Sequence, residues 1–326
     1  MTTLPPTGFL LHPASPLHDP GWGHPDHQGR LRALASAVNR DMLTLHEKVV
    51  QVEARTATRD EVLRVHTPGH LDRLRDAVDR AMEEGEPVFV AGDTPVSEAS
   101  WDAAMGSAGA VLAAVDAVQK GHVRNAFVAA RPPGHHAGPD EAMGFCLVNH
   151  VAVGARYVQD RGVGRKVLVV DWDVHHGNGT QEIFQADPDV FYLSVHQSSH
   201  FPGTGSADET GTGEGEGTTL NVPLPAGTPR EVYRESLMEA LRDVRGRFQP
   251  DFVFVSCGFD LLAGDPLGDQ AVEPNDLFDF TGEVVSWAGE ACGGRVVAVL
   301  EGGHVPERQG EGTVAALRAL AGLEAP

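Results

Sequence analysis

Residues 166–179, KVLVVDWDVHHGNG, join a short apolar run to a cluster of aspartates and histidines. A run rich in β-branched residues that stops at polar residues and glycine is typical of a buried strand that ends in a loop. Similar runs occur at 125–130, 190–196, 251–257 and 295–300. Strands that are apolar throughout and alternate with helices predict an α/β protein in which helices cover both faces of a parallel sheet.

The stretches between these runs, and much of the first hundred residues, carry helical patterns. Amphipathic spacing or an alanine-rich composition predicts helices at 30–49, 70–84, 100–121, 149–162, 230–248 and 276–292. The glycine-rich segment 203–219 lacks the preceding strand and the following helix of a nucleotide-binding loop, so we expect a flexible connection there. We expect residues 1–326 to form one domain with a large core.

Composition excludes several classes of protein. A net charge of −21 repels phosphate backbones, so we expect no direct nucleic-acid partner, although the same charge attracts cationic ligands or simply favours solubility. Residues 1–16 lack the pattern of a signal peptide, and no apolar run is long enough to span a membrane. The scattered cysteines Cys146, Cys257 and Cys292 are typical of reduced thiols in a cytoplasmic protein.

A polar cluster follows each predicted strand. The carboxyl ends of parallel strands meet at one edge of a sheet, where ligands bind in open α/β folds. We therefore expect these segments to form one site. They read, in chain order, RPPGHHAG, DWDVHHGNG, HQSSHFPGTG, GFDLLAGDPLG and EGGH.

The cluster DWDVHHG predicts a metal centre. Side chains that alternate along an extended chain place Asp171, Asp173 and His175 on one face. Carboxylates that gather in this way are costly to bury unless a cation lies among them, although aspartates that only cap turns are the simpler alternative. Asp260 comes from another strand end and completes a set of Asp173, His175 and Asp260. Three protein ligands with open positions are typical of catalytic zinc, while Fe²⁺, Co²⁺ and Mn²⁺ suit the same donors.

Two neighbouring histidines suggest how such a metal could act. His135 and His136 follow another strand, and an imidazole beside a metal-bound water can take its proton. No serine or cysteine lies in a nucleophile elbow. We interpret His150, His196 and His200 as structural or lining residues. The residues by themselves therefore predict a metal-dependent hydrolase that uses activated water.

The ordered motifs resemble those of the zinc-dependent histone deacetylase family, which includes acetylpolyamine amidohydrolases and acetoin-utilisation proteins. The resemblance runs from GHPDHQGR near residue 23 to EGGH, and Trp172 and Asn178 are similar to the class II branch and its bacterial relatives. It implies the three-layer arginase/deacetylase fold, with a central, mostly parallel sheet. It also implies that the substrates are acylated lysine or acylated small amines. Independently of the resemblance, we expect a cytoplasmic enzyme and a possible homo-oligomer.

The resemblance also implies roles for individual residues. Asp173, His175 and Asp260 would bind zinc, His136 would be the general base, and His135 would support it electrostatically. The remaining assignments concern orientation, potassium and substrate. Asp171 and Asn178 would orient the two histidines from behind. A structural K⁺ would be held by Asp171, Asp173, His175, Ser194 and Val195. Gly144, Phe145 and Phe201 would wall the substrate tunnel, and Leu267 stands where polyamine-selective relatives carry a carboxylate.

The chain departs from the family pattern at two positions. Gln28 stands where the family usually has proline, which puts the shape of that loop in doubt. His304 stands where most members have the tyrosine that donates a hydrogen bond to the oxyanion. Loss of one such donor typically costs about 10²–10³ in rate. We expect His304 to point outward and leave a wider acyl pocket.

Three functions fit these residues. The first is a deacylase that acts on acyl-lysine and is weak on plain acetyl groups because of His304. The second is an amidohydrolase for acetylpolyamines or other small molecules, which Leu267 disfavours. The third is a non-enzymatic binder of acyl-lysine or of a partner protein, which the intact histidine and ligand set disfavours.

Overall fold

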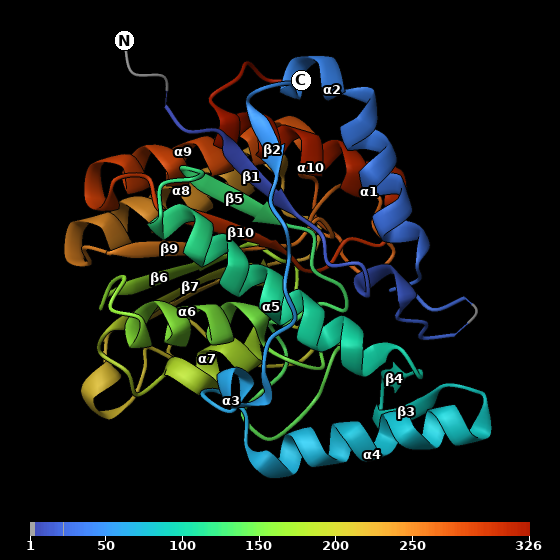
Figure 1. Cartoon of the computed structure of the whole chain (residues 1–326). Helices are drawn as coiled ribbons and strands as arrows, with labels where there is room; N and C mark the ends of the chain where they lie inside the picture. Colours follow the sequence, from blue (N-terminus) through green and yellow to red (C-terminus); the bar gives the residue numbers. More distant parts are fainter. Residues whose placement is uncertain (1–3, 22) are drawn as a thin grey trace.

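The structure is a computed structural model that describes residues 4–21 and 23–326. Its central feature is a parallel sheet of eight strands in the order β2-β1-β5-β10-β9-β6-β7-β8 (Figure 1). The strands are β1 (Thr7–Leu10), β2 (Val49–Gln51), β5 (Asn125–Val128), β6 (Val167–Asp171), β7 (Val190–Gln197), β8 (Thr219–Leu224), β9 (Phe252–Cys257) and β10 (Val296–Leu300). The predicted parallel sheet is therefore confirmed.

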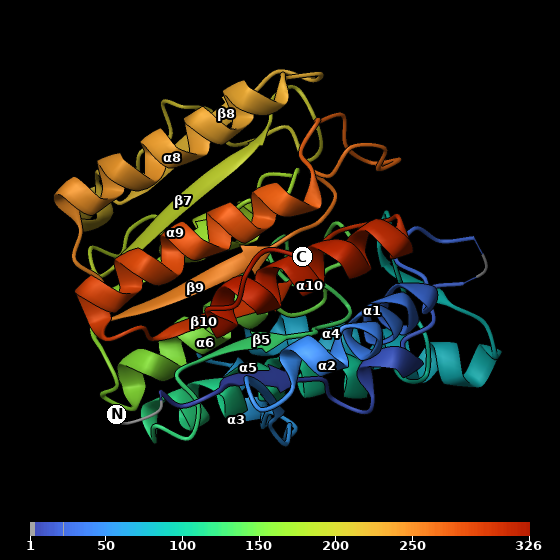
Figure 2. The ribbon, with the colours of Figure 1, turned by 90° about the horizontal axis from the view of Figure 1, so that it is seen from above.

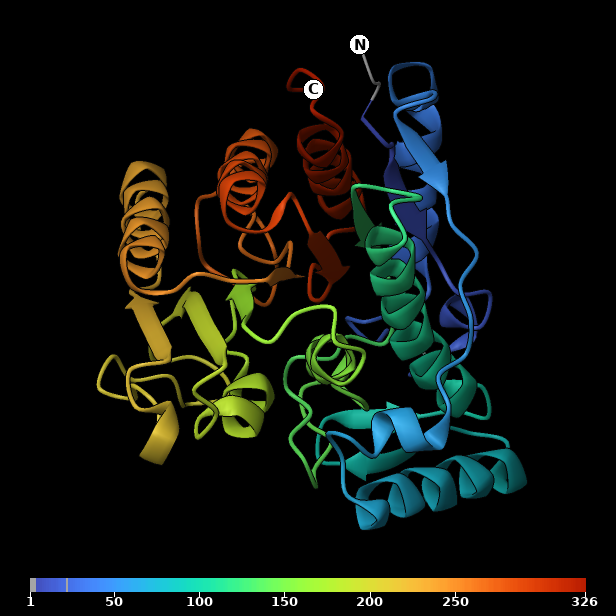
Figure 3. The same ribbon diagram turned by 60° about the vertical axis from the view of Figure 1, so that its left-hand side comes forward.

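Helices cover both faces of this sheet, as the apolar strands require. Figure 3 shows the three layers nearly end on, and Figure 2 shows α8, α9 and α10 lying across one face. That layer consists of α1 (Gly29–Arg40), α8 (Arg230–Arg247), α9 (Pro274–Cys292) and α10 (Pro306–Ala321). The opposite layer contains α4 (Pro68–Glu84), α5 (Ser100–Gln119), α6 (His150–Asp160) and α7 (Asn178–Phe184).

Alternation along the strands divides the core between these two layers. In β6, Val167 and Val169 pack toward α5 and α6, whereas Leu168 and Val170 pack toward α8 and α9. All four side chains are fully buried. A strand with two buried faces cannot show the alternation of polar and apolar residues of a surface strand, which is why each run is apolar throughout.

The prediction of one helix over residues 30–49 is wrong. Helix α1 ends at Arg40, a single turn follows in α2 (Met42–Leu45), and the chain then extends into β2. Strand β2 pairs in parallel with β1 at the sheet edge, where Thr7 lies opposite Val49. Pairing with the sheet outweighs the local helical pattern at this point.

Several elements, most of them short, escaped the sequence patterns. Besides β1, β2, β8 and α10, they include the small antiparallel pair β3 (Val88–Ala91) and β4 (Thr94–Val96), and the short helix α3 (Arg59–Val62). The glycine-rich segment connects β7 to β8 and contains one 3-10 turn, Gly213–Gly215. None of the helices in the described part of the chain is long and apolar enough to cross a membrane.

Candidate active site and metal centre

The polar clusters meet at the carboxyl edge of the sheet. Strands β5, β10, β9 and β6 are neighbours in the sheet although they are far apart in the chain. A cavity of about 240 Å³ opens there. Its walls are formed by residues from the loops after these strands and from two further loops: Asp93, Pro133, His135, His136, Gly144, Phe145, Asp173, His175, His200, Phe201, Asp260, Leu267, Gly302 and His304.

Asp173, His175 and Asp260 form a buried cluster whose ligand atoms all lie within 4.8 Å of one another. Nδ1 of His175 is 3.0 Å from Oδ1 of Asp173 and 3.3 Å from Oδ2 of Asp260. Burial disfavours charge on this imidazole, yet the two carboxylates raise the pKa of His175 to about 10. The site thus holds a proton very tightly, and a divalent cation would replace that proton.

The free atoms of this cluster fit a metal ion. Oδ2 of Asp260 is buried and accepts no well-aligned hydrogen bond from the described residues, although Nδ1 of His175 lies 3.3 Å away. Oδ1 of Asp260 instead accepts a bond from the main-chain nitrogen of Val174 at 2.9 Å, which fixes the direction of the carboxylate. An unpartnered buried carboxylate oxygen is costly unless a cation or a proton meets it. The residues present are therefore suited to zinc.

The two neighbouring histidines have different partners. Nδ1 of His135 lies 3.0 Å from Oδ2 of Asp171, and Nδ1 of His136 lies 2.8 Å from Oδ1 of Asn178. Burial opposes charge on His135, but Asp173 and Asp171 raise its pKa to about 10. Burial, His135 and His175 hold the pKa of His136 well below its ordinary value. His136 is therefore the neutral imidazole, and its Nε2 carries a lone pair because Nδ1 donates to Asn178.

The surface of the cavity is mainly apolar. Gly144 and Phe145 both have positive φ, at 55° and 68°. A side chain at Gly144 would place its Cβ 2.4 Å from His136 and 2.9 Å from Phe201, so only glycine fits. The ring centroids of His136 and Phe201 are 5.2 Å apart in an edge-to-face arrangement. These aromatic walls suit the stem of an extended apolar ligand.

His304 is part of the cavity wall. Its side chain is only 3% exposed, and Nδ1 lies 3.2 Å from Oδ1 of Asp265. The ring also makes an edge-to-face contact with Phe145, at a centroid distance of 6.2 Å. The imidazole therefore does not swing into solvent. Its predicted outward direction relative to the metal, with a wider acyl pocket, stays a prediction.

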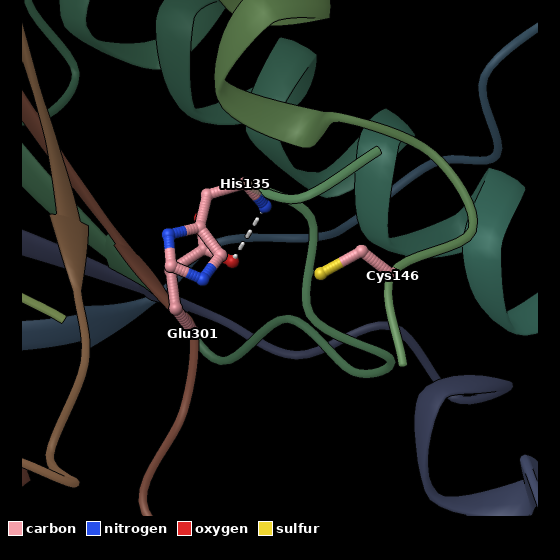
Figure 4. Close-up of side chains that lie close together, drawn as sticks. All are labelled: His135, Cys146 and Glu301. Atoms are coloured by element: carbon pink, nitrogen blue, oxygen red, sulfur yellow. Dashed lines mark hydrogen bonds between the residues drawn. The ribbon is translucent and has the colours of Figure 1, made fainter. Parts of the chain in front are cut away.

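A second buried group shares His135 with the site and also contains Cys146 and Glu301 (Figure 4). The carboxylate of Glu301 accepts bonds from the main-chain nitrogens of Gly134 at 2.6 Å and His135 at 3.2 Å, and from Ser256 Oγ at 3.0 Å. Burial raises the pKa of Glu301 to about 7 and that of the Cys146 thiol well above its usual range. Because protein donors already satisfy the carboxylate and the thiol keeps its proton, we interpret this group as structural support for His135.

The other predicted residues lie farther from the cavity or at its edge. Ser194 is opposite Asp171 in the pairing of β6 with β7, and its Oγ bonds Nδ1 of His196 at 2.9 Å. Val195 is buried, and its carbonyl accepts a bond from Tyr233. Leu267 and His200 line the cavity, and Nε2 of His200 donates to the carbonyl of Leu267 at 2.8 Å.

Sequence reasoning missed five residues of the site: Asp93, Pro133, Gly302, Glu301 and Asp265. Asp93 comes from the turn between β3 and β4, and its Oδ1 accepts the Gly144 nitrogen at 3.1 Å. No local pattern marks that short hairpin as part of a distant site. Gly302, Glu301 and Asp265 stood within quoted motifs, but their contacts depend on neighbouring strands.

The sequence-family model named histone deacetylase domain matches residues 24–320 of this chain. The chain belongs to the histone deacetylase family. Histone deacetylase 10, chloroplastic, of Oryza sativa subsp. japonica is 36% identical over 310 residues, which cover 92% of this chain and 70% of that protein. The probable deacetylase of Archaeoglobus fulgidus is 36% identical over 301 residues, covering 92% and 82%. The histone deacetylase-like amidohydrolase of Pseudomonas aeruginosa is 36% identical over 303 residues, covering 93% and 76%.

A solved structure agrees with this assignment. The crystal structure of the HDA15 HD domain has a TM-score of 0.90 and 35% sequence identity, and covers 99% of this chain and 90% of that one. The fold is therefore the arginase/deacetylase fold. As a histone deacetylase family member, the chain is a hydrolase that acts on amide bonds, and the third sequence-based function, a binder without enzymatic activity, is set aside.

Proposed function

We propose that the protein is a zinc-dependent deacylase that acts on N-acylated amines, above all on acyl-lysine, and is weak on plain acetyl-lysine. The observation that supports this most is the buried cluster of Asp173, His175 and Asp260 at the end of an apolar cavity, beside a neutral His136. When bound by these three residues, Zn²⁺ would supply Lewis acidity and lower the pKa of water. Fe²⁺ and Co²⁺ suit the same donors.

The histidines divide the proton chemistry. Nε2 of His136 takes the proton of the attacking water, and Asn178 holds the ring with that nitrogen free. His135 remains bonded to Asp171, so it is a fixed donor and positive charge rather than a base. His136 then passes this proton to the amine nitrogen as the C–N bond breaks. The aromatic walls of Phe145 and Phe201 hold the acyl-amine stem and exclude water.

We further propose a structural K⁺ beside this centre. The support is the placement of Asp171 and Ser194 opposite one another, with Val195 next in β7, because buried carbonyl, hydroxyl and carboxylate oxygens suit a hard cation. Asp173 and His175, in the loop after β6, would supply further oxygens to this ion. Such an ion would hold the loop after β6 in register with β7.

His304 gives the most direct test of this function. We expect the zinc-loaded protein to hydrolyse trifluoroacetyl-lysine and longer acyl-lysine peptides faster than acetyl-lysine. The His304→Tyr variant should gain at least about tenfold in kcat/KM on acetyl-lysine, since it restores a hydroxyl donor for the oxyanion. A smaller gain would contradict the lost-donor explanation. Faster turnover of N-acetylputrescine than of acyl-lysine peptides would favour the small-molecule amidohydrolase instead.

A further inference from the structure

Asp265 holds His304 at two points. One oxygen, Oδ2, accepts the main-chain nitrogen of His304 at 2.6 Å, and the other, Oδ1, lies 3.2 Å from its Nδ1. Oδ1 also accepts the nitrogen of Leu267 at 2.9 Å. The two side chains are 3% and 2% exposed, so water does not compete for these bonds. The carboxylate thus fixes both the loop after β10 and the ring that this loop carries.

This contact determines which ring nitrogen carries the hydrogen. A carboxylate has no proton to donate, so Nδ1 of His304 must be the donor. In the neutral ring Nε2 then carries the lone pair. Nε2 has no hydrogen-bond partner among the described residues and is not one of the fully enclosed unpartnered atoms. Since His304 lines the cavity, Nε2 is the nitrogen that a ligand can reach.

The surroundings make this acceptor unusual. Four of the other residues that line the cavity, Pro133, Phe145, Phe201 and Leu267, have side chains without a hydrogen-bonding group. Oδ1 of Asp93 is already taken by Gly144. A bare acceptor in an apolar cavity loses its water when a ligand enters, which is costly unless the ligand supplies a donor.

We propose that Asp265 fixes His304 in the Nδ1–H tautomer, so that Nε2 selects acyl groups that carry a hydroxyl near the scissile carbonyl. The substrate class is 2- and 3-hydroxyacyl amines. This inference rests on the deacylase function proposed above, and the reaction remains hydrolysis. The oxygen of water enters the carboxylate of the released hydroxy acid, the C–N bond breaks, and the amine nitrogen takes a proton. Asp265 is a positioning residue, and His304 is the specificity residue.

The kinetic test compares two peptides on the zinc-loaded full chain: propionyl-lysine and 2-hydroxypropionyl-lysine, which differ only in the hydroxyl. We expect kcat/KM to favour the hydroxyl by about fivefold to tenfold, which is the value of one neutral hydrogen bond. His304→Phe keeps a planar ring without nitrogen and should abolish this preference, and Asp265→Asn should weaken it. The matched control is Asp269→Asn, an exposed carboxylate of the same loop, which should keep the preference.

A second measurement does not depend on turnover. In ¹⁵N-histidine spectra of the neutral ring, recorded at alkaline pH, we expect His304, assigned by its loss in His304→Phe, to show an unprotonated Nε2 and a protonated Nδ1. Asp265→Asn should mix the two tautomers. A protonated Nε2 with a bare Nδ1 in the wild type would overturn the proposal. The proposal would also be overturned if the ratio of kcat/KM for the two peptides changed less than twofold in His304→Phe while both peptides are hydrolysed. Failure to hydrolyse any acyl-lysine would instead overturn the deacylase function itself.

Discussion

The two adjacent histidines show how one residue's partner decides its chemistry. His135 faces the carboxylate of Asp171, and His136 faces the amide of Asn178. A carboxylate stabilises an imidazolium ion, whereas an amide orients the ring without adding negative charge. His136 therefore stays neutral beside the positively charged His135 and can serve as a base.

Replacing this amide should change the pH profile. We expect Asn178→Asp to raise the pKa of His136, because an anion within about 4–6 Å of a buried imidazole favours its charged form. The base must be neutral to act, so the acidic limb of kcat/KM should move to higher pH and activity below that limb should fall. A pH–rate profile measures the shift. Asn178→Ala is the control, and an unchanged limb in Asn178→Asp would argue against His136 as the base.

At the scale of elements, the loops after β6, β9 and β10 form the metal centre together. The nitrogen of Gly302 donates to Oδ2 of Asp173 at 2.8 Å, and a Cβ at this position would lie 1.9 Å from Oδ2 of Asp260. The backbone after β10 must therefore pass directly against two metal ligands. This close approach explains why residue 302 is a glycine.

Gly302→Ala should damage the metal site more than the fold. The added methyl must push the carboxylate of Asp260 aside, so we expect zinc affinity to fall at least tenfold, as for other losses of ligand orientation. Competition with a chromogenic chelator measures it. Gly289→Ala in α9 is the matched control, because its Cβ meets no atom within 4 Å. Equal zinc affinity in the two variants would contradict the assigned ligands.

At the scale of the whole molecule, one buried charge network ties the N-terminal segment to the rim. Oδ1 of Asp26 bonds Arg30 and lies 3.2 Å from Nε of Arg131. Arg30 reaches on to the carbonyls of Gly303 and Glu301, both at 2.6 Å. Burial opposes ionisation of Asp26, but the two arginines lower its pKa from 3.8 to about 2. The network thus joins the loop before α1 to the loops after β5 and β10.

Removing this charge should destabilise the protein. Asp26→Asn leaves two buried arginines without their carboxylate, so we expect a loss of about 3 kcal/mol in the free energy of unfolding by urea. Because the pKa of Asp26 is lower in the folded state, the wild-type contribution is present above about pH 4 and disappears as the pH falls through about 2. Asp72→Asn, which breaks an exposed pair with Arg59, should cost less than about 1 kcal/mol. Equal losses in both variants would contradict this role.

The sequence by itself determined the five strands β5, β6, β7, β9 and β10, most of the long helices and the metal-ligand candidates. The reason is that two-sided burial leaves apolar runs, and the ligands Asp173 and His175 lie in one short loop. Only the tertiary structure decided the rest. It brought Asp265 to His304, Asn178 to His136 and Asp93 to Gly144. These contacts join segments 39, 42 and 51 residues apart, and no local spacing records them. The first two arise because parallel strands bring distant loops to one edge of the sheet. The third arises because the turn between β3 and β4 packs against the loop after β5.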